Sequence, residues 1–283
     1  MDAAMNVFRT LLLAAFGASL LTAQAPAPAG PPKLQVLIIT GQNGHDWRGT
    51  TPLLKQALEE TGRFEVRVTE EFRGAGPETL APYDLVVVNY FERGQPALLW
   101  GDRPNKALVD YVRGGKGLVL YHFSIAAFNG WTEYEQMSAG NWRPAKGHHS
   151  ARHDFTVDIK DTTHPITAGL KTPLAVQNDE LYANLKWQPE GSWHLLASAY
   201  DDHGLYDDKA SDARSKQPMS GAGVNEPMLW TTQFGSGRVF TTALGHDGSS
   251  VIQDTFKVTF TRGAEWAATG KVTLPIPAGL AAR

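Results

Sequence analysis

The sequence predicts a doubly wound α/β fold with a mostly parallel sheet and an antiparallel hairpin extension. From Leu34 to His122, strand-like and helix-like segments alternate, which is typical of parallel sheets with helical crossovers. The strand-like segments are apolar runs, as expected for strands buried on both faces. Further along, "MLWTTQFGSGRVFTTALGH" has two β-rich runs around Gly235-Ser236-Gly237, and this pattern predicts the hairpin.

Local signals place each element of the first half. Pro52 suits the first turn of a helix, and Gly62 ends that helix. The run "VVV" marks a central strand, and Gly114 with Gly115 stops a second helix. In chain order we expect a strand at 34–40, a helix at 50–62, an edge strand at 64–70, a central strand at 83–90, a helix at 105–115 and a strand at 117–121.

The second half has a more mixed character. We expect strands at 153–159 and 192–200, and a closing helix at 250–270 whose stop signal is Gly270. Residues 203–225 are polar and have no period, so they predict a long loop, either a lid or a disordered segment.

Composition excludes several classes of protein. The net charge of −3 and the lack of a basic run argue against nucleic-acid binding. The chain has no Cys, which excludes disulfides, thiolate metal ligands and a Cys nucleophile. With 283 residues, 42% of them hydrophobic, the chain is long enough to bury a sizeable core.

The N-terminus resembles a targeting segment. Arg9 precedes "TLLLAAFGASLLTA", which has the length of a signal-peptide core and is too short to span a membrane. We therefore expect a signal peptide at 1–25, a Pro/Ala-rich linker at 26–33, the α/β domain at 34–270 and a tail at 271–283. The expected location is periplasmic or secreted, without a stable membrane anchor after cleavage; the alternative is an uncleaved N-terminal anchor.

Histidines follow three of the predicted strands. Ligands of open α/β sheets bind beyond the carboxyl ends of the strands. His45 and Trp47 follow the first strand, Asn89 ends the third, His122 follows the fourth and His246 follows the hairpin. The coincidence predicts a shared site, although one histidine at a strand end is commonly an ordinary loop residue.

Two further segments carry titratable groups. "GHHSARH" contains His149 and His153, whose spacing puts them on one face only if the segment is helical; the alternative is a solvated loop. "NDELYANL" contains Asp179 and Glu180, and a carboxylate near a histidine orients it or transfers protons itself. The alternative is a pair of exposed charges starting a helix. A divalent metal needs three or four converging ligands, and no compact metal motif settles that question.

Two enzyme classes do not fit. The elbow after the fourth strand reads Tyr121-His122-Phe123-Ser124, without the G-x-S-x-G of serine hydrolases. No G-x-G-x-x-G follows the first strand, so dehydrogenase-type nucleotide binding is not expected. Aromatic rings stack on sugar faces, and the tryptophans considered for this are Trp47, Trp131, Trp142 and Trp230; core positions are expected for Trp187 and Trp266.

Six segments in order resemble a known family. They are "VLIITGQNGHDW", "GGKGLVLYH", "GHHSARHDFTVDIKDTTHPITAGL", "DELY", "PMLWTTQFGSGRVFTTALGH" and "GAEWAATG". Over about residues 34–270 the chain is similar to the ThuA-like, or trehalose utilisation, family. The resemblance implies a flavodoxin-like fold of the class I glutamine amidotransferase type, with His122 in the elbow region of the missing catalytic Cys. Glutamine hydrolysis by a Cys is therefore excluded.

The resemblance also implies carbohydrate metabolism. It indicates an enzyme that acts on a disaccharide or glycoside, oxidised to a 3-keto sugar by an upstream sugar dehydrogenase, and the leader segment predicts that this enzyme is exported. The positions that match the family are His45, His122, His149, His153, Glu180, Tyr182 and His246. The chain departs from the family in its export signal and in the loop at 203–225.

We expect elimination or hydrolysis with His122 and Glu180 as the acid–base pair. His45 and His246 would orient the sugar or hold a metal. The expected substrate contacts are Trp47, Asn89, His149, His153 and Tyr182. The alternatives are a non-catalytic periplasmic sugar-binding or accessory protein and a metal-dependent hydrolase.

Overall fold

A computed structural model describes residues 32–92, 100–205 and 223–282. The compact unit runs over Lys33–Arg283. The expected leader and most of the linker lie outside the described residues, as does most of the loop at 203–225. Within the described ranges, no helix has both the length and the apolarity needed to cross a membrane.

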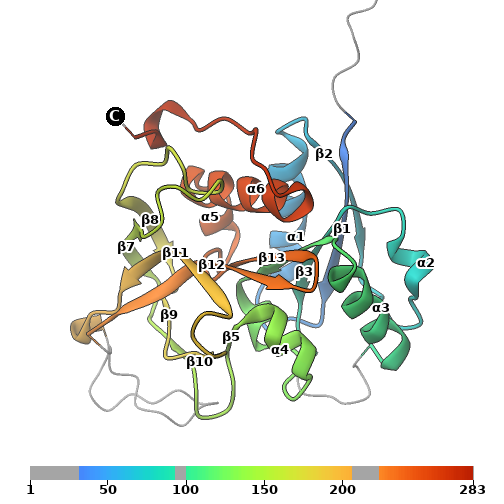
Figure 1. Cartoon of the computed structure of the whole chain (residues 1–283). Helices are drawn as coiled ribbons and strands as arrows, with labels where there is room; N and C mark the ends of the chain where they lie inside the picture. The colour runs from blue at the N-terminus through green and yellow to red at the C-terminus, as the bar shows by residue number, and fades with distance from the viewer. Residues whose placement is uncertain (1–31, 93–99, 206–222, 283) are drawn as a thin grey trace, which may run out of the picture. The chain divides into compact units, whose positions relative to one another are not determined.

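The described residues form a nine-stranded sheet with a parallel half and an antiparallel half (Figure 1). The parallel half has the order β2-β1-β3-β4-β13, the flavodoxin-like arrangement, so the fold prediction is confirmed. Its strands are β1 (Leu34–Gly41), β2 (Phe64–Thr69), β3 (Leu85–Tyr90), β4 (Gly117–Tyr121) and β13 (Gly237–Thr242).

The hairpin joins the two halves. β12 (Asn225–Phe234) runs antiparallel to β13, while the other edge of β13 pairs in parallel with β4. The extension continues through β11 (Trp193–Tyr200), β7 (His153–Ile159) and β8 (Leu174–Asp179). In the β4–β13 register Tyr121 lies opposite Thr242, so the residues after both strands meet.

Helices cover both faces of the sheet, and alternate residues of each strand enter two separate cores. Val36 and Ile38 face the core that includes the helices α1 and α6, whereas Leu37 and Ile39 face the core that includes α2, α3 and α4. The helices are α1 (Trp47–Glu59), α2 (Pro77–Leu80), α3 (Asp102–Arg113), α4 (Thr132–Ser138), α5 (Gly248–Val251) and α6 (Asp254–Thr269).

The closing helix differs from the sequence prediction in one detail. The closing helix is divided into α5 and α6 by a break before Asp254, where Gln253 is extended. Gly270 ends α6 in the left-handed conformation, as predicted. The segment after it packs on the domain, because Thr273 donates a hydrogen bond of 2.6 Å to the buried Glu265 and Leu280 is buried.

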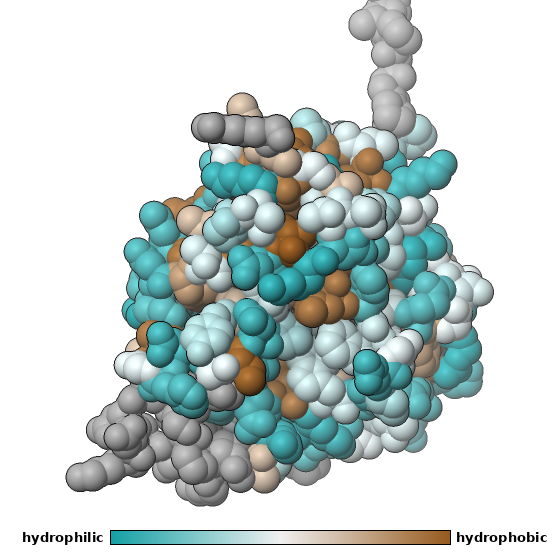
Figure 2. All heavy atoms as spheres, turned by 60° about the vertical axis from the view of Figure 1, so that its left-hand side comes forward, coloured by the Kyte–Doolittle hydropathy of each residue, from teal (hydrophilic) through white to brown (hydrophobic). Residues whose placement is uncertain are grey.

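Short elements complete the site end of the sheet. β6 (His148–His149) pairs with β9 (Tyr182–Ala183), and β5 (Gly140–Asn141) pairs with β10 (Lys186–Trp187). Single-turn helices occur at η2 (His122–Ala126), η3 (His203–Leu205) and η4 (Ala278–Leu280). On the face in Figure 2 polar side chains predominate, and hydrophobic residues form small separate groups.

Candidate active site

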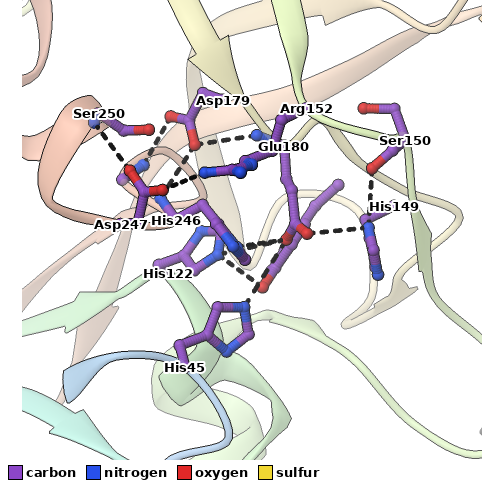
Figure 3. Close-up of polar contacts among 12 residues, drawn as sticks. His45, His122, His149, Ser150, Arg152, Asp179, Glu180, His246, Asp247 and Ser250 are labelled. Atoms are coloured by element: carbon purple, nitrogen blue, oxygen red, sulfur yellow. Dashed lines mark hydrogen bonds and ion pairs between the residues drawn. The ribbon is translucent and has the colours of Figure 1, made fainter.

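Four predicted site residues converge at the carboxyl end of the parallel strands (Figure 3). His45 comes from the loop after β1, His122 from the turn after β4, Glu180 from the end of β8 and His246 from the loop after β13. Each offers one ligand or proton-transfer atom, and these atoms all lie within 4.8 Å of one another. We call these four residues the His/Glu cluster.

His122 occupies a strained turn at the elbow. Its φ of 46° is in the left-handed region, which is uncommon for a residue other than glycine and is frequent at functional sites. The ring is buried, and its Nδ1 lies 2.6 Å from the carbonyl of Ala243. Because a carbonyl only accepts, Nδ1 carries the proton and Nε2 keeps its lone pair, to which the Tyr182 hydroxyl donates at 2.8 Å.

Glu180 lies at the centre of the cluster. Its Oε2 is 2.8 Å from Nδ1 of His246 and 3.7 Å from Nε2 of both His45 and His122. Burial alone would raise the pKa of this carboxyl, but the surrounding imidazoles outweigh burial and hold the pKa well below its usual range. Glu180 is therefore an ionised carboxylate in a largely buried site.

Burial, above all, lowers the pKa of His45 to about 4, so its imidazole is neutral at neutral pH. Its loop is fixed by amides: the backbone N–H of His45 donates to Asn43 at 2.9 Å, and Asn43 donates to Asn89 at 3.1 Å. The amide nitrogen of the buried Asn89 bonds to Thr50 and Thr51. The expectation that Asn89 contacts the substrate is therefore revised, because its side chain supports the His45 loop.

Asp179, which the sequence offered beside Glu180 as a candidate carboxylate, supports the backbone of the cluster. It is buried, and its carboxylate accepts the backbone N–H groups of Glu180 (2.9 Å), His246 (2.9 Å) and Gly245 (2.8 Å). Because Asp179 ends β8 and Glu180 is also buried, the alternative of two exposed charges starting a helix is wrong. What the sequence did not predict is that Asp179 accepts three backbone N–H groups.

His149 connects the cluster to solvent. Its Nδ1 lies 2.8 Å from the carbonyl of Ser150 and 3.1 Å from Oε1 of Glu180, while its side chain is 36% exposed. Both neighbours accept hydrogen bonds, so Nδ1 carries a proton. The segment is not helical, since His149 belongs to β6 and His153 begins β7.

The other predicted contacts lie outside the cluster. His153 Nδ1 is near the Ser150 hydroxyl (3.1 Å) and the Ala151 carbonyl (2.9 Å), so Ser150 lies between His153 and the cluster. Trp47 is buried at the start of α1 with the Arg48 guanidinium 4.0 Å above its ring. The structure does not bring Trp47 or His153 into the cluster.

A different tryptophan borders the site. The ring centroid of Trp142 is 5.0 Å from that of Tyr182, 5.7 Å from that of His149 and 6.5 Å from that of Phe123. By contrast, Trp230 is fully buried and donates from its indole to the Ser138 carbonyl, so it is a core residue and not a sugar platform.

Fold and site together define an α/β protein with a flavodoxin-like, class I glutamine amidotransferase-like fold that carries a His/Glu cluster at the carboxyl end of its parallel strands. The family model for trehalose utilisation, ThuA, matches residues 35–267. The chain belongs to the ThuA family, and the predicted resemblance is confirmed.

Solved structures support this assignment. A ThuA-like protein from Parabacteroides merdae is 30% identical, with a TM-score of 0.72 over 88% of this chain and 95% of that one. A second, from Bacteroides uniformis, is 16% identical, with a TM-score of 0.64 over 88% and 97%. A β-galactosidase from a Rahnella species is 15% identical, with a TM-score of 0.51 over 88% of this chain and 33% of that one, and shares the fold alone. No curated protein matches the chain.

Proposed function

We propose that the chain is an exported enzyme that cleaves an oxidised (keto) glycoside by proton transfer at the His/Glu cluster. Membership of the trehalose utilisation family supports a carbohydrate substrate. The observation that carries the proposal is the pair formed by Glu180 and His149. A buried, ionised carboxylate orients a partly exposed imidazole through its Nδ1, and the neutral form of that imidazole can accept a proton at Nε2.

The chemistry follows from the carbonyl of a 3-keto sugar, which acidifies the C–H bond at C2. His149 Nε2 takes that proton, and negative charge develops on the carbonyl oxygen. The C1–O bond then breaks, and the departing oxygen takes up the proton that His149 holds. Water adds across the resulting C1=C2 bond, so the net reaction is hydrolysis. Each acid–base group of this kind contributes about 10²–10⁴-fold to the rate.

This division of roles differs from the one expected from the sequence. His122 is only 1% exposed, and both of its ring nitrogens are already engaged, with Ala243 and Tyr182. We therefore assign His122 to the buried side of the cluster and give the first proton transfer to His149. Glu180 keeps a catalytic role because it orients His149 and carries the negative charge of the site.

The test is a time-resolved NMR spectrum of the protein with 3-keto-trehalose, beside plain trehalose. We expect glucose to be released from the keto sugar alone, and His149→Gln to lower kcat by about 10²-fold or more with little change in the melting temperature. His153→Gln is the matched control, because that ring lies outside the cluster. Sugar binding without conversion would instead favour a binding or accessory protein.

Export and supply of the substrate complete the proposal. The leader-like segment at 1–25 supports a periplasmic or secreted protein, and N-terminal sequencing of the protein recovered from the periplasm or medium tests it. A keto glycoside must be made by an oxidoreductase that removes two hydrogens from the sugar. We therefore expect a sugar dehydrogenase to act upstream.

A further inference from the structure

We propose that the His/Glu cluster is a binding site for one divalent first-row transition-metal ion, such as Zn²⁺, Mn²⁺ or Co²⁺. This inference deepens the proposed function, because the same residues form the proposed reaction centre. The ligand atoms would be Nε2 of His45, Nε2 of His122, Nδ1 of His246 and Oε2 of Glu180.

The spacing of these atoms suits a shared ion. The Glu180 oxygen is 2.8, 3.7 and 3.7 Å from the three imidazole nitrogens, and all four atoms lie within 4.8 Å of one another. In a tetrahedral site, bonds of about 2.0–2.2 Å to one ion place the ligand atoms about 3.4 Å apart. The separations from the Glu180 oxygen, 2.8 Å and twice 3.7 Å, lie on either side of this value.

The atoms converge without satisfying one another. Oε2 of Glu180 and Nδ1 of His246 are buried and 2.8 Å apart, yet neither forms a hydrogen bond within the described part of the chain. Buried polar atoms normally have hydrogen-bond partners, so a pair that faces each other without one calls for an explanation. A cation bound between the lone pairs of Glu180 Oε2 and His246 Nδ1 would explain why these two atoms face each other.

Neighbouring groups orient the proposed ligand atoms, as the hydrogen-bond partners of metal ligands commonly do. The carbonyl of Ala243 keeps the proton on Nδ1 of His122, which leaves Nε2 as the donor atom. Oε1 of Glu180 faces His149, so Oε2 is left for the ion.

The donor set selects the class of ion. Three imidazoles with one carboxylate suit Zn²⁺, Mn²⁺, Fe²⁺, Co²⁺ or Ni²⁺, whereas Mg²⁺ and Ca²⁺ prefer oxygen ligands. An ion bound here would polarise the sugar carbonyl. Coordination through Nε2 of His122 would release the Tyr182 hydroxyl, which then becomes a hydrogen-bond donor for an oxygen beside the ion.

The test measures the protein and the metal alone. The purified chain is stripped with a chelator, dialysed and titrated with Co²⁺ and Zn²⁺, using calorimetry and the visible absorption of Co²⁺. We expect one equivalent to bind, with a visible Co²⁺ band and a higher melting temperature. Absence of stoichiometric binding by the wild-type chain would overturn the proposal.

Variants locate the ion. His246→Gln and Glu180→Gln should each weaken binding by more than the about 10–100-fold that loss of a supporting partner costs. His164→Gln is the matched control, since His164 lies near His194 and Trp266 and outside the cluster, and its affinity should equal that of the wild type. Unchanged affinity in both cluster variants would also refute the site.

The two proposals fail separately. Stoichiometric metal binding together with no turnover of any keto glycoside would support the ion site and reject the proposed function. Turnover by a chain that binds no ion would support the function and reject the ion site.

Discussion

The carboxylate of Asp179 accepts the backbone N–H of His246 at 2.9 Å and thereby ties the end of β8 to the loop after β13. The same carboxylate accepts the N–H groups of Glu180 and Gly245. One buried side chain therefore sets the distance between Glu180 and His246, two members of the cluster that are far apart in sequence.

Asp179→Asn replaces one accepting oxygen by an NH₂ group that faces backbone N–H donors. We expect the free energy of unfolding to fall by about 1–3 kcal/mol, because a buried donor is left unsatisfied. Turnover should fall at least about 10-fold as the His246 loop loosens. Urea unfolding and kcat measure the two effects. Asp158→Asn, at a half-exposed carboxylate outside the cluster, serves as the control and should change neither.

Tyr182→Phe removes the hydroxyl that donates to His122 Nε2 at 2.8 Å. We expect kcat to fall by about 10-fold or more with a modest change in stability, since the ring still packs beside Trp142. Tyr111→Phe, on α3 and away from the cluster, removes a hydroxyl that donates to the carbonyl of Tyr83. If both variants lower kcat equally, the hydroxyl of Tyr182 has no specific role in the reaction.

Gly263→Ala probes the contact between α6 and β13. A Cβ atom at Gly263 would lie 2.2 Å from the Phe240 ring, so the helix must move away from the sheet. We expect a loss of about 1–3 kcal/mol from overpacking, which exceeds the gain in helix propensity of about 1 kcal/mol. Thermal unfolding measures the loss. Gly279→Ala, where nothing lies within 4 Å of the added atom, should leave the melting temperature close to that of the wild type.

The lowered pKa of His164 predicts that the folded protein loses stability in acid. Burial, and then His194, lower the pKa of His164 to about 4, and its Nδ1 accepts the Ile166 N–H at 3.2 Å. Between pH about 6.5 and about 4 the unfolded chain binds more protons at this residue than the folded chain. The free energy of unfolding therefore falls as the pH falls, by up to about 1.4 kcal/mol per pH unit.

His164→Asn tests this dependence, because it retains a hydrogen-bond acceptor and does not titrate. We expect urea unfolding of this variant to vary less with pH between about 6.5 and 4.5 than that of the wild type. Parallel pH profiles for the two proteins would contradict the assignment to His164.

Much of the fold follows from local patterns. Apolar runs such as "LVVV" in β3 predict strands, and Gly62, Gly114 and Gly270 mark helix ends, because backbone preferences act over a few residues. The break before Asp254 was not predicted, since the apolar spacing of the closing segment continues across it.

The sequence by itself determined the strands of the parallel half, the hairpin and the helices α1 and α3, and it named the four members of the cluster. Only the tertiary structure decided which atoms face one another. The pairing of β4 with β13 brings Ala243 to His122, and no local pattern encodes this pairing, because the two strands are distant in sequence. The supporting role of Asn89, the bridge made by Asp179 and the position of His149 between Glu180 and solvent depend on the same long-range packing.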